Sequence, residues 1–241
     1  MVTDCTLEKY LSSVLVGNRT ESRNIIEHCM QSGIPANRIY MDILWPVMLE
    51  IEKLHRAGRI DTAQEHLASR INRTIVDQLQ NKLPRKEQKD KKIVICCAST
   101  EHSELGAQMA ADIFESDGWE VRFLGGGVTN DELISFTNIY SPNMLLIYGA
   151  TASLAPSVRE LIDSVRNINA CPNMKIMLSG GIFDRAEGLW EEIGADMYAE
   201  TAHQAVQMGN MGAESRPVPV RDINKRKRSR RVPEEMLVAA K

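Results

Sequence analysis

Apolar residues follow two different periods along this chain. From residue 6 to about residue 83 they recur every three or four positions, which is typical of amphipathic helices. From residue 93 they gather in short continuous runs separated by amphipathic segments, which is typical of strands covered on both faces of a sheet. The pattern therefore predicts a helical part followed by an α/β part.

The first part predicts a bundle of four helices over residues 4–83. Glycines at 17, 33 and 58 mark the ends of the first three helices. The fourth has an N-cap type of residue at its start and Glu65 four positions later, followed by a long stripe of apolar residues. The expected helices begin at Thr6, Thr20, Asn37 and Asp61. Four helices joined by short turns favour a bundle.

Residues 84–92 carry a proline and a run of charges that cannot bury an apolar face, so they are expected to form a linker. The second part, residues 93–210, then repeats a βα unit five times. The expected strands are 93–97, 121–124, 144–148, 175–178 and 197–199, and the expected helices are 104–117, 130–139, 155–167, 185–193 and 201–208. Right-handed crossovers turn such repeats into a doubly wound, flavodoxin-like (Rossmann-like) parallel sheet, which binds ligands beyond the carboxyl ends of its strands.

Length and composition agree with two compact units and a tail. The 241 residues are 43% hydrophobic and 25% charged, as in ordinary soluble proteins, so each unit can bury a core of its own. No apolar run is long enough to span a membrane, and the N-terminus does not read as a secretion signal, so a cytoplasmic protein is expected. The five cysteines are odd in number and scattered, which favours reduced thiols, with Cys96 and Cys97 packing as small apolar residues.

The last segment, residues 211–241, predicts a flexible tail. Residues 225–231 carry six positive charges in seven positions, so the tail could contact nucleic acid or anionic lipid, or simply keep the chain end soluble. Aromatic residues are absent from this cluster, which gives no support for base stacking.

The segment after the first expected strand carries the strongest functional signal. Residues 99–106 read STEHSELG, and they are followed by GAQMAA at 106–111, LSGG at 178–181 and IGADMYA at 193–199. In these segments the sequence resembles the cobalamin-binding domain, whose D-x-H-x-x-G signature supplies a histidine below the cobalt. Aligning on Gly106 places Glu101 at the aspartate and Ser103 at the histidine. Serine cannot replace imidazole as a strong cobalt ligand, and the small hydroxyl residue of the family's third strand reads as Gly149 here.

The resemblance extends to the helical part. A bundle before this domain is shared by corrinoid methyltransferase carriers and by light- or cofactor-sensing repressors, in which a W-x9-E-H motif covers the upper face of the corrin. Glu65 and His66 match the end of this motif, and His55 stands at the Trp position. The resemblance implies cobalt ligation by His66 or by His102, one residue before Ser103. Both histidines could equally lie on the surface, and Glu65 could serve only the helix dipole.

The resemblance implies that cobalamin lies between the bundle and the carboxyl ends of the strands. Gly125 and its two following glycines would let backbone approach a ligand, although three glycines also make an ordinary turn. The implied contacts of the cofactor are Glu65, His66, Glu101, His102, Ser103, Gly106, Gly125, Gly149, Thr151, Ser153, Gly180, Gly181 and Tyr198. The form of the cofactor stays open between hydroxo-, methyl- and adenosylcobalamin, another tetrapyrrole, and no cofactor.

Three functions remain. The first expectation is a sensor without catalytic activity, in which cofactor occupancy changes the surface offered to a transcription factor; no helix-turn-helix segment precedes the bundle to read DNA directly. The second is a corrinoid carrier that moves methyl groups in a methyltransferase system. The third is an interaction module that has lost its cofactor, which the departures at Ser103 and Gly149 favour.

Overall fold

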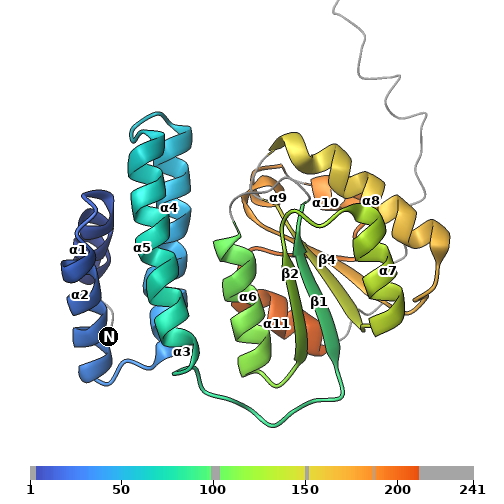
Figure 1. Ribbon diagram of the computed structural model, residues 1–241, viewed down its shortest axis with the longest axis horizontal. Coiled ribbons are helices and arrows are strands. Elements are labelled where there is room, and N and C mark those ends of the chain that lie inside the picture. The colour runs from blue at the N-terminus through green and yellow to red at the C-terminus, as the bar shows by residue number, and fades with distance from the viewer. Residues whose placement is uncertain (1–3, 99–103, 150–151, 187, 212–241) are drawn as a thin grey trace, which may run out of the picture.

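The computed structural model describes residues 4–98, 104–149, 152–186 and 188–211, and Figure 1 shows a helical bundle beside an α/β domain. Within the described residues no helix is both long and apolar enough to cross a membrane. The two expected parts are both present, in the expected order.

The bundle contains α1 (Asp4–Leu15), α2 (Arg19–Gln31), α3 (Ala36–Ile39), the π-helical turn η1 (Tyr40–Leu44), α4 (Trp45–Arg56) and α5 (Thr62–Gln80). The third expected helix is thus continuous from α3 to α4 but contains a π turn. The N–H group of Trp45 donates to the carbonyl oxygen of Tyr40, five residues back. Pro46 follows and has no N–H group, so the regular ladder is interrupted at this position.

Helix α5 begins with a capping box at Asp61. The Asp61 carboxylate accepts from the N–H group of Gln64 at 2.8 Å, and the Gln64 side chain accepts from the N–H group of Asp61 at 3.2 Å. Gln64 therefore completes the cap. The Glu65 carboxylate accepts instead from the hydroxyl of Ser69 at 2.8 Å.

The α/β domain has the expected alternation. Its elements are β1 (Lys92–Cys97), α6 (Leu105–Ser116), β2 (Glu120–Gly125), α7 (Asn130–Tyr140), β3 (Met144–Tyr148), the 3-10 turn η2 (Ala152–Leu154), α8 (Ala155–Ile168), β4 (Lys175–Ser179), α9 (Gly181–Arg185), α10 (Leu189–Ile193), β5 (Met197–Ala199) and α11 (Ala202–Met211). The five strands are parallel in the order β2-β1-β3-β4-β5, which confirms the doubly wound, flavodoxin-like sheet. The helix expected at 185–193 is present only as α10, because Gly188 takes a left-handed conformation (φ 75°) that a continuous helix does not allow, and the short helix α9 that precedes it was not expected.

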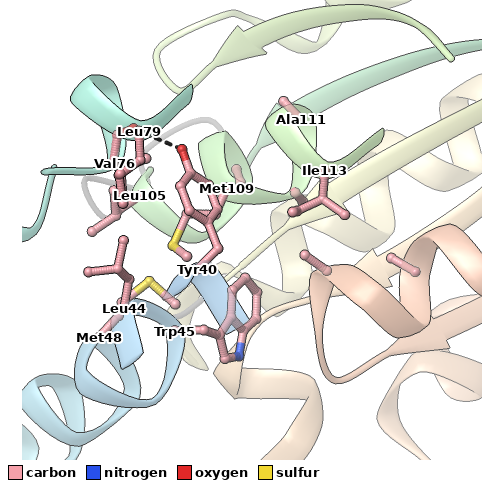
Figure 2. Close-up of a cluster of buried hydrophobic side chains, with 14 of the residues drawn as sticks. Tyr40, Leu44, Trp45, Met48, Val76, Leu79, Leu105, Met109, Ala111 and Ile113 are labelled. Atoms are coloured by element: carbon pink, nitrogen blue, oxygen red, sulfur yellow. Dashed lines mark hydrogen bonds between the residues drawn. The ribbon is translucent and has the colours of Figure 1, made fainter. Parts of the chain in front are cut away.

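The bundle and the sheet share one hydrophobic core, although the composition predicted a core for each part. Helices α6 and α11 cover one face of the sheet, and the bundle packs on the outer side of α6 (Figure 1). Figure 2 shows Tyr40, Trp45 and Met48 of the bundle around Leu105 and Met109 of α6. Because α6 is covered on both sides, almost all of its residues are buried, including Asp112. On the opposite face of the sheet, a second hydrophobic core lies between the strands and helices α7 and α8.

The expected linker is fastened to the end of α6. The N–H groups of Lys86 and Lys89 donate to the carbonyl oxygens of Ser116 and Gly118, at 2.9 and 2.7 Å. The ammonium groups of both lysines contact the buried carboxylate of Asp117. The segment is therefore held against the end of α6 by specific hydrogen bonds and ion pairs.

Candidate functional site

The carboxyl ends of the strands form an edge that is rich in glycine. Gly125 ends β2 and two further glycines follow it, Gly149 follows β3, and Gly180 and Gly181 follow β4. Gly125 and Gly127 have φ angles of 68° and 77°, a region that favours glycine. Large side chains are therefore absent from these turns.

The turns after β3 and β4 lie in direct contact. The N–H group of Gly149 donates to the carbonyl oxygen of Ser179 at 2.9 Å. Gly180 has a φ of 108°, and a Cβ atom at this position would collide with the carbonyl oxygen of Gly149. Ile182 and Phe183 lie beneath Gly149, 3.5 Å from where its Cβ would be. The close approach of the two backbone turns therefore explains glycine at 180, whereas a Cβ atom at Gly149 would make only ordinary contacts.

Tyr198 carries an unusual hydroxyl group next to this edge. It lies in β5 opposite Leu178, one residue before the strand ends. Its hydroxyl oxygen is buried and has no hydrogen-bond partner within the described part of the chain. A buried hydroxyl without a partner costs about 1–3 kcal/mol, so a polar group of a ligand would be a favourable partner.

Helix α5 faces the start of α6, and the two helices run in the same direction. Arg73 donates to the carboxylate of Glu104 and to the side-chain oxygen of Gln108, both at 3.3 Å. Gln108 donates in turn to Asp77 at 2.6 Å. These contacts identify the face of α5 that points toward the α/β domain.

His66 lies on this same face. It precedes Arg73 by seven residues, two turns of helix, so it stands about 10 Å further along α5, past the start of α6. The His66 ring is 63% exposed and lies 3.5 Å from the carboxylate of Glu65. His66 is thus an exposed histidine on the side of α5 that faces the α/β domain.

A second contact joins the bundle to the edge from another side. The Arg185 guanidinium at the end of α9 donates to Glu52 of α4 at 2.9 Å, and Arg56 donates to the same carboxylate oxygen at 3.1 Å. The bundle therefore contacts the α/β domain both at α6 and at α9, on two sides of the glycine turns.

Several predicted site residues can be placed and others cannot. Glu101, His102, Ser103 and Thr151 lie outside the described residues. Ser153 is exposed in η2. Gly106 packs against Tyr148, whose hydroxyl an added Cβ would meet, so its small size has a structural reason within the chain. Among the described residues, no group of three or more His, Cys, Asp or Glu side chains could hold a metal ion by itself.

The sequence prediction missed the polar residues that join the two parts: Glu52, Arg73, Glu104, Gln108 and Arg185. Charged residues on a helix surface look alike in sequence whether they face solvent or a neighbouring domain. Glu104 and Gln108 lie within the quoted segments 99–106 and 106–111, but nothing in those segments pointed to contacts with the bundle.

The fold defines a class: a doubly wound α/β protein with a helical bundle packed beside the first helix of its sheet domain. Two family profiles, each described as "B12 binding domain", match residues 6–80 and 91–207. Together they cover the bundle and the α/β domain, and the chain belongs to the B12-binding domain family. The cofactor expected from the sequence, a cobalamin, is the cofactor of this family.

Similar proteins include two from Methanosarcina acetivorans. "Dimethylamine corrinoid protein 1" is 24% identical over 162 residues, covering 66% of this chain and 75% of the relative. "Dimethylamine corrinoid protein 3" is 22% identical over 207 residues, covering 85% and 90%. A similar solved structure is the monomethylamine corrinoid protein of Methanosarcina barkeri, with a TM-score of 0.77, 17% identity, and coverage of 86% of this chain and 97% of that one. At this identity the structural likeness shows the shared fold.

The described residues fit a corrinoid. Glycines stand in the described turns at the edge, the buried Tyr198 hydroxyl lacks a partner in the described residues, and His66 lies on the face of α5 that meets the start of α6. The departure from the family pattern that bears most directly on cobalt is Ser103, which stands where the family motif has histidine. A serine hydroxyl is a poor cobalt ligand, so residue 103 does not fit the role of the family's ligand below the cobalt.

Proposed function

We propose that this protein is a corrinoid-binding carrier protein, which holds a cobalamin between its bundle and the carboxyl edge of its sheet and serves a methyl-transfer system. The main support is the match to relatives named as corrinoid proteins over 85% of this chain and 90% of the relative. The fold of a further corrinoid protein follows this chain through both of its parts.

The proposal assigns roles to residues on both sides of the edge. His66 and Glu65 would face the cofactor from the bundle, where the His66 ring nitrogen could contact the metal. The backbone at Gly125, Gly149, Gly180 and Gly181 and the hydroxyl of Tyr198 would hold the remainder of the cofactor from the sheet. Glu101, His102, Ser103, Thr151, Ser153 and Gly106 belong to the same proposal by their place in the family motif.

When bound, the corrinoid would supply a cobalt centre that accepts and releases a methyl group. The chain itself would bind and orient this group and exclude water from it, and a separate methyltransferase would be its partner. We therefore propose a carrier that is not itself the catalyst of the transfer.

The regulatory role expected first from the sequence finds no support in the named relatives, and a transcription-factor partner is likewise unsupported. Their names favour the carrier that the sequence left as the second function. The basic cluster at 225–231 lies outside the described residues, and its contact with nucleic acid stays a prediction.

Reconstitution with hydroxocobalamin tests the proposal. The full chain is incubated with the cofactor, separated from free cofactor by gel filtration, and examined by visible absorption. We expect stoichiometric retention and a shifted spectrum. A chain that elutes without chromophore would reject corrinoid binding and leave the cofactor-free interaction module.

Histidine variants of the loaded protein test the assigned ligands. We expect His66→Ala or His102→Ala to shift the spectrum more than Ser103→Ala does. His28→Ala is the matched control, because His28 is an exposed histidine on α2 and is not among the proposed contacts of the cofactor. Identical spectra in both of the first two variants would reject ligation through these histidines.

A further inference from the structure

Glu104 touches two parts of the molecule that are far apart in sequence. One carboxylate oxygen accepts from the N–H group of Gly126, in the turn after β2, at 2.7 Å. The other accepts from the Arg73 guanidinium of α5 at 3.3 Å. Glu104 stands at the N-cap of α6 but makes no side-chain cap there, so its carboxylate is directed to these two partners.

The glycine turn is built to receive this carboxylate. A Cβ atom at Gly125 would lie 3.0 Å from the nearer Glu104 oxygen, so glycine leaves the required space. Three successive glycines restrict their own backbone very little. A charge-assisted hydrogen bond to the middle amide therefore has a large influence on the shape of this turn.

The Arg73 end of the contact is also held in place. Arg73 donates to Gln108 as well as to Glu104, and Gln108 donates to Asp77. The polar contacts thus run without a break from α5 of the bundle, through the first turns of α6, to the turn after β2.

We propose that Glu104 is a positioning residue that couples the position of the bundle to the conformation of the 125–127 turn. The glycine turn and the bundle are the two sides of the proposed cofactor site. The Glu104 carboxylate therefore influences the position of both sides. The consequence for the cofactor rests on the proposed function; the coupling itself does not.

Amide exchange at Gly126 measures the coupling directly, by NMR of the 15N-labelled full chain without cofactor. Glu104→Ala removes the acceptor, and we expect exchange at Gly126 to become about tenfold faster or more. Glu104→Gln keeps an acceptor oxygen and should restore most of the protection. Arg73→Ala does not touch Gly126, yet we expect a several-fold faster exchange there, because the carboxylate loses its second anchor.

Lys53→Ala is the control, because the ion pair of Lys53 with Glu50 lies within α4. It should leave Gly126 unchanged. Exchange at Gly126 that is equal in Arg73→Ala and the wild type would overturn the coupling. An increase of the same size in Lys53→Ala would also overturn it, because the effect would then be a general loosening.

Titration with hydroxocobalamin, followed by visible absorption, tests the consequence for the cofactor. We expect Glu104→Ala to bind about tenfold more weakly than the wild type, and Lys53→Ala to bind equally well. Equal affinity in Glu104→Ala would overturn the role at the cofactor site. If the wild type takes up no cofactor, the proposed function and this role both fail, while exchange at Gly126 still decides the coupling.

Discussion

The hydroxyl of Tyr40 lies 3.0 Å from the carboxyl group of Asp112 and 2.8 Å from the carbonyl oxygen of Val76. The tyrosine hydroxyl has a single proton, so it can donate a strong hydrogen bond to only one of these two acceptors. When Asp112 carries a proton, it can donate to Tyr40 while Tyr40 donates to Val76, and both contacts are satisfied. Tyr40, Asp112 and Val76 come from η1, α6 and α5, so the network lies buried between the bundle and the α/β domain. Figure 2 shows Tyr40 and Val76 of this network.

Burial raises the pKa of Asp112 to about 6, and the negative charges of Glu115 and Asp77 add to this, against hydrogen bonds from Tyr40 and Gln80. A carboxyl group whose pKa is raised on folding contributes its stability below the unfolded pKa of 3.8 and loses it as the pH rises through about 6. We expect this contribution to fall by about 2 kcal/mol between pH 4.5 and 7.5. Asp112→Asn should remove this part of the pH dependence, measured by urea unfolding at both values.

Asp131→Asn is the control for Asp112, because Asp131 is exposed in the first turn of α7. Its pH dependence should follow the wild type. An Asp112→Asn protein with the slope of the wild type would contradict the assignment.

Asp117 should contribute to stability with the opposite dependence on pH. Burial by itself would raise its pKa, but hydrogen bonds from Lys86, Lys89 and Asn210 outweigh this and lower the pKa to about 2. The ionised group therefore contributes stability above pH 3.8, which is lost as the pH falls through about 2. Because the two lysines are partly exposed, we expect Asp117→Asn to cost only about 1 kcal/mol at pH 7. Thermal unfolding should show a smaller difference at pH 3, and a difference that grows with acid would be inconsistent with the ion pairs.

Alanine substitutions at two glycines of the candidate edge should lower the free energy of unfolding by very different amounts. Gly180→Ala combines a φ of 108° with a collision against the Gly149 carbonyl oxygen, and should cost about 3 kcal/mol or more. Gly127→Ala has a φ of 77° but open space around its Cβ, and should cost about 1 kcal/mol. Urea unfolding of the two variants measures the difference, and equal losses would argue against the close contact of the β3 and β4 turns.

Cys96 should resist modification in the folded protein. It is 1% exposed, and burial raises the pKa of its thiol to about 12, so the reactive thiolate is scarce. Iodoacetamide at pH 8 should label the partly exposed Cys171 first and reach Cys96 only after unfolding, as followed by peptide mass spectrometry. Equal labelling rates at the two cysteines would indicate that β1 opens readily.

The sequence by itself determined the order of helices and strands, the parallel sheet and the family motif, because periodicity and strand burial are properties of neighbouring residues. The expected strands agree with the structure to within a residue or so. The break between α9 and α10 was not predicted, because it depends on the left-handed backbone conformation of a single residue, Gly188.

Only the tertiary structure decided how the two parts meet. That Asp112 is buried against Tyr40 and that Arg73 reaches Glu104 depend on how the bundle packs on α6, and that Glu104 reaches Gly126 depends on how the start of α6 lies against the turn after β2. The hydrogen-bonded partners are separated by 22 to 72 positions along the chain, and side chains of the same type elsewhere face solvent. The energy of such contacts comes from burial and charge pairing between distant segments, which no local pattern of apolar and polar positions records.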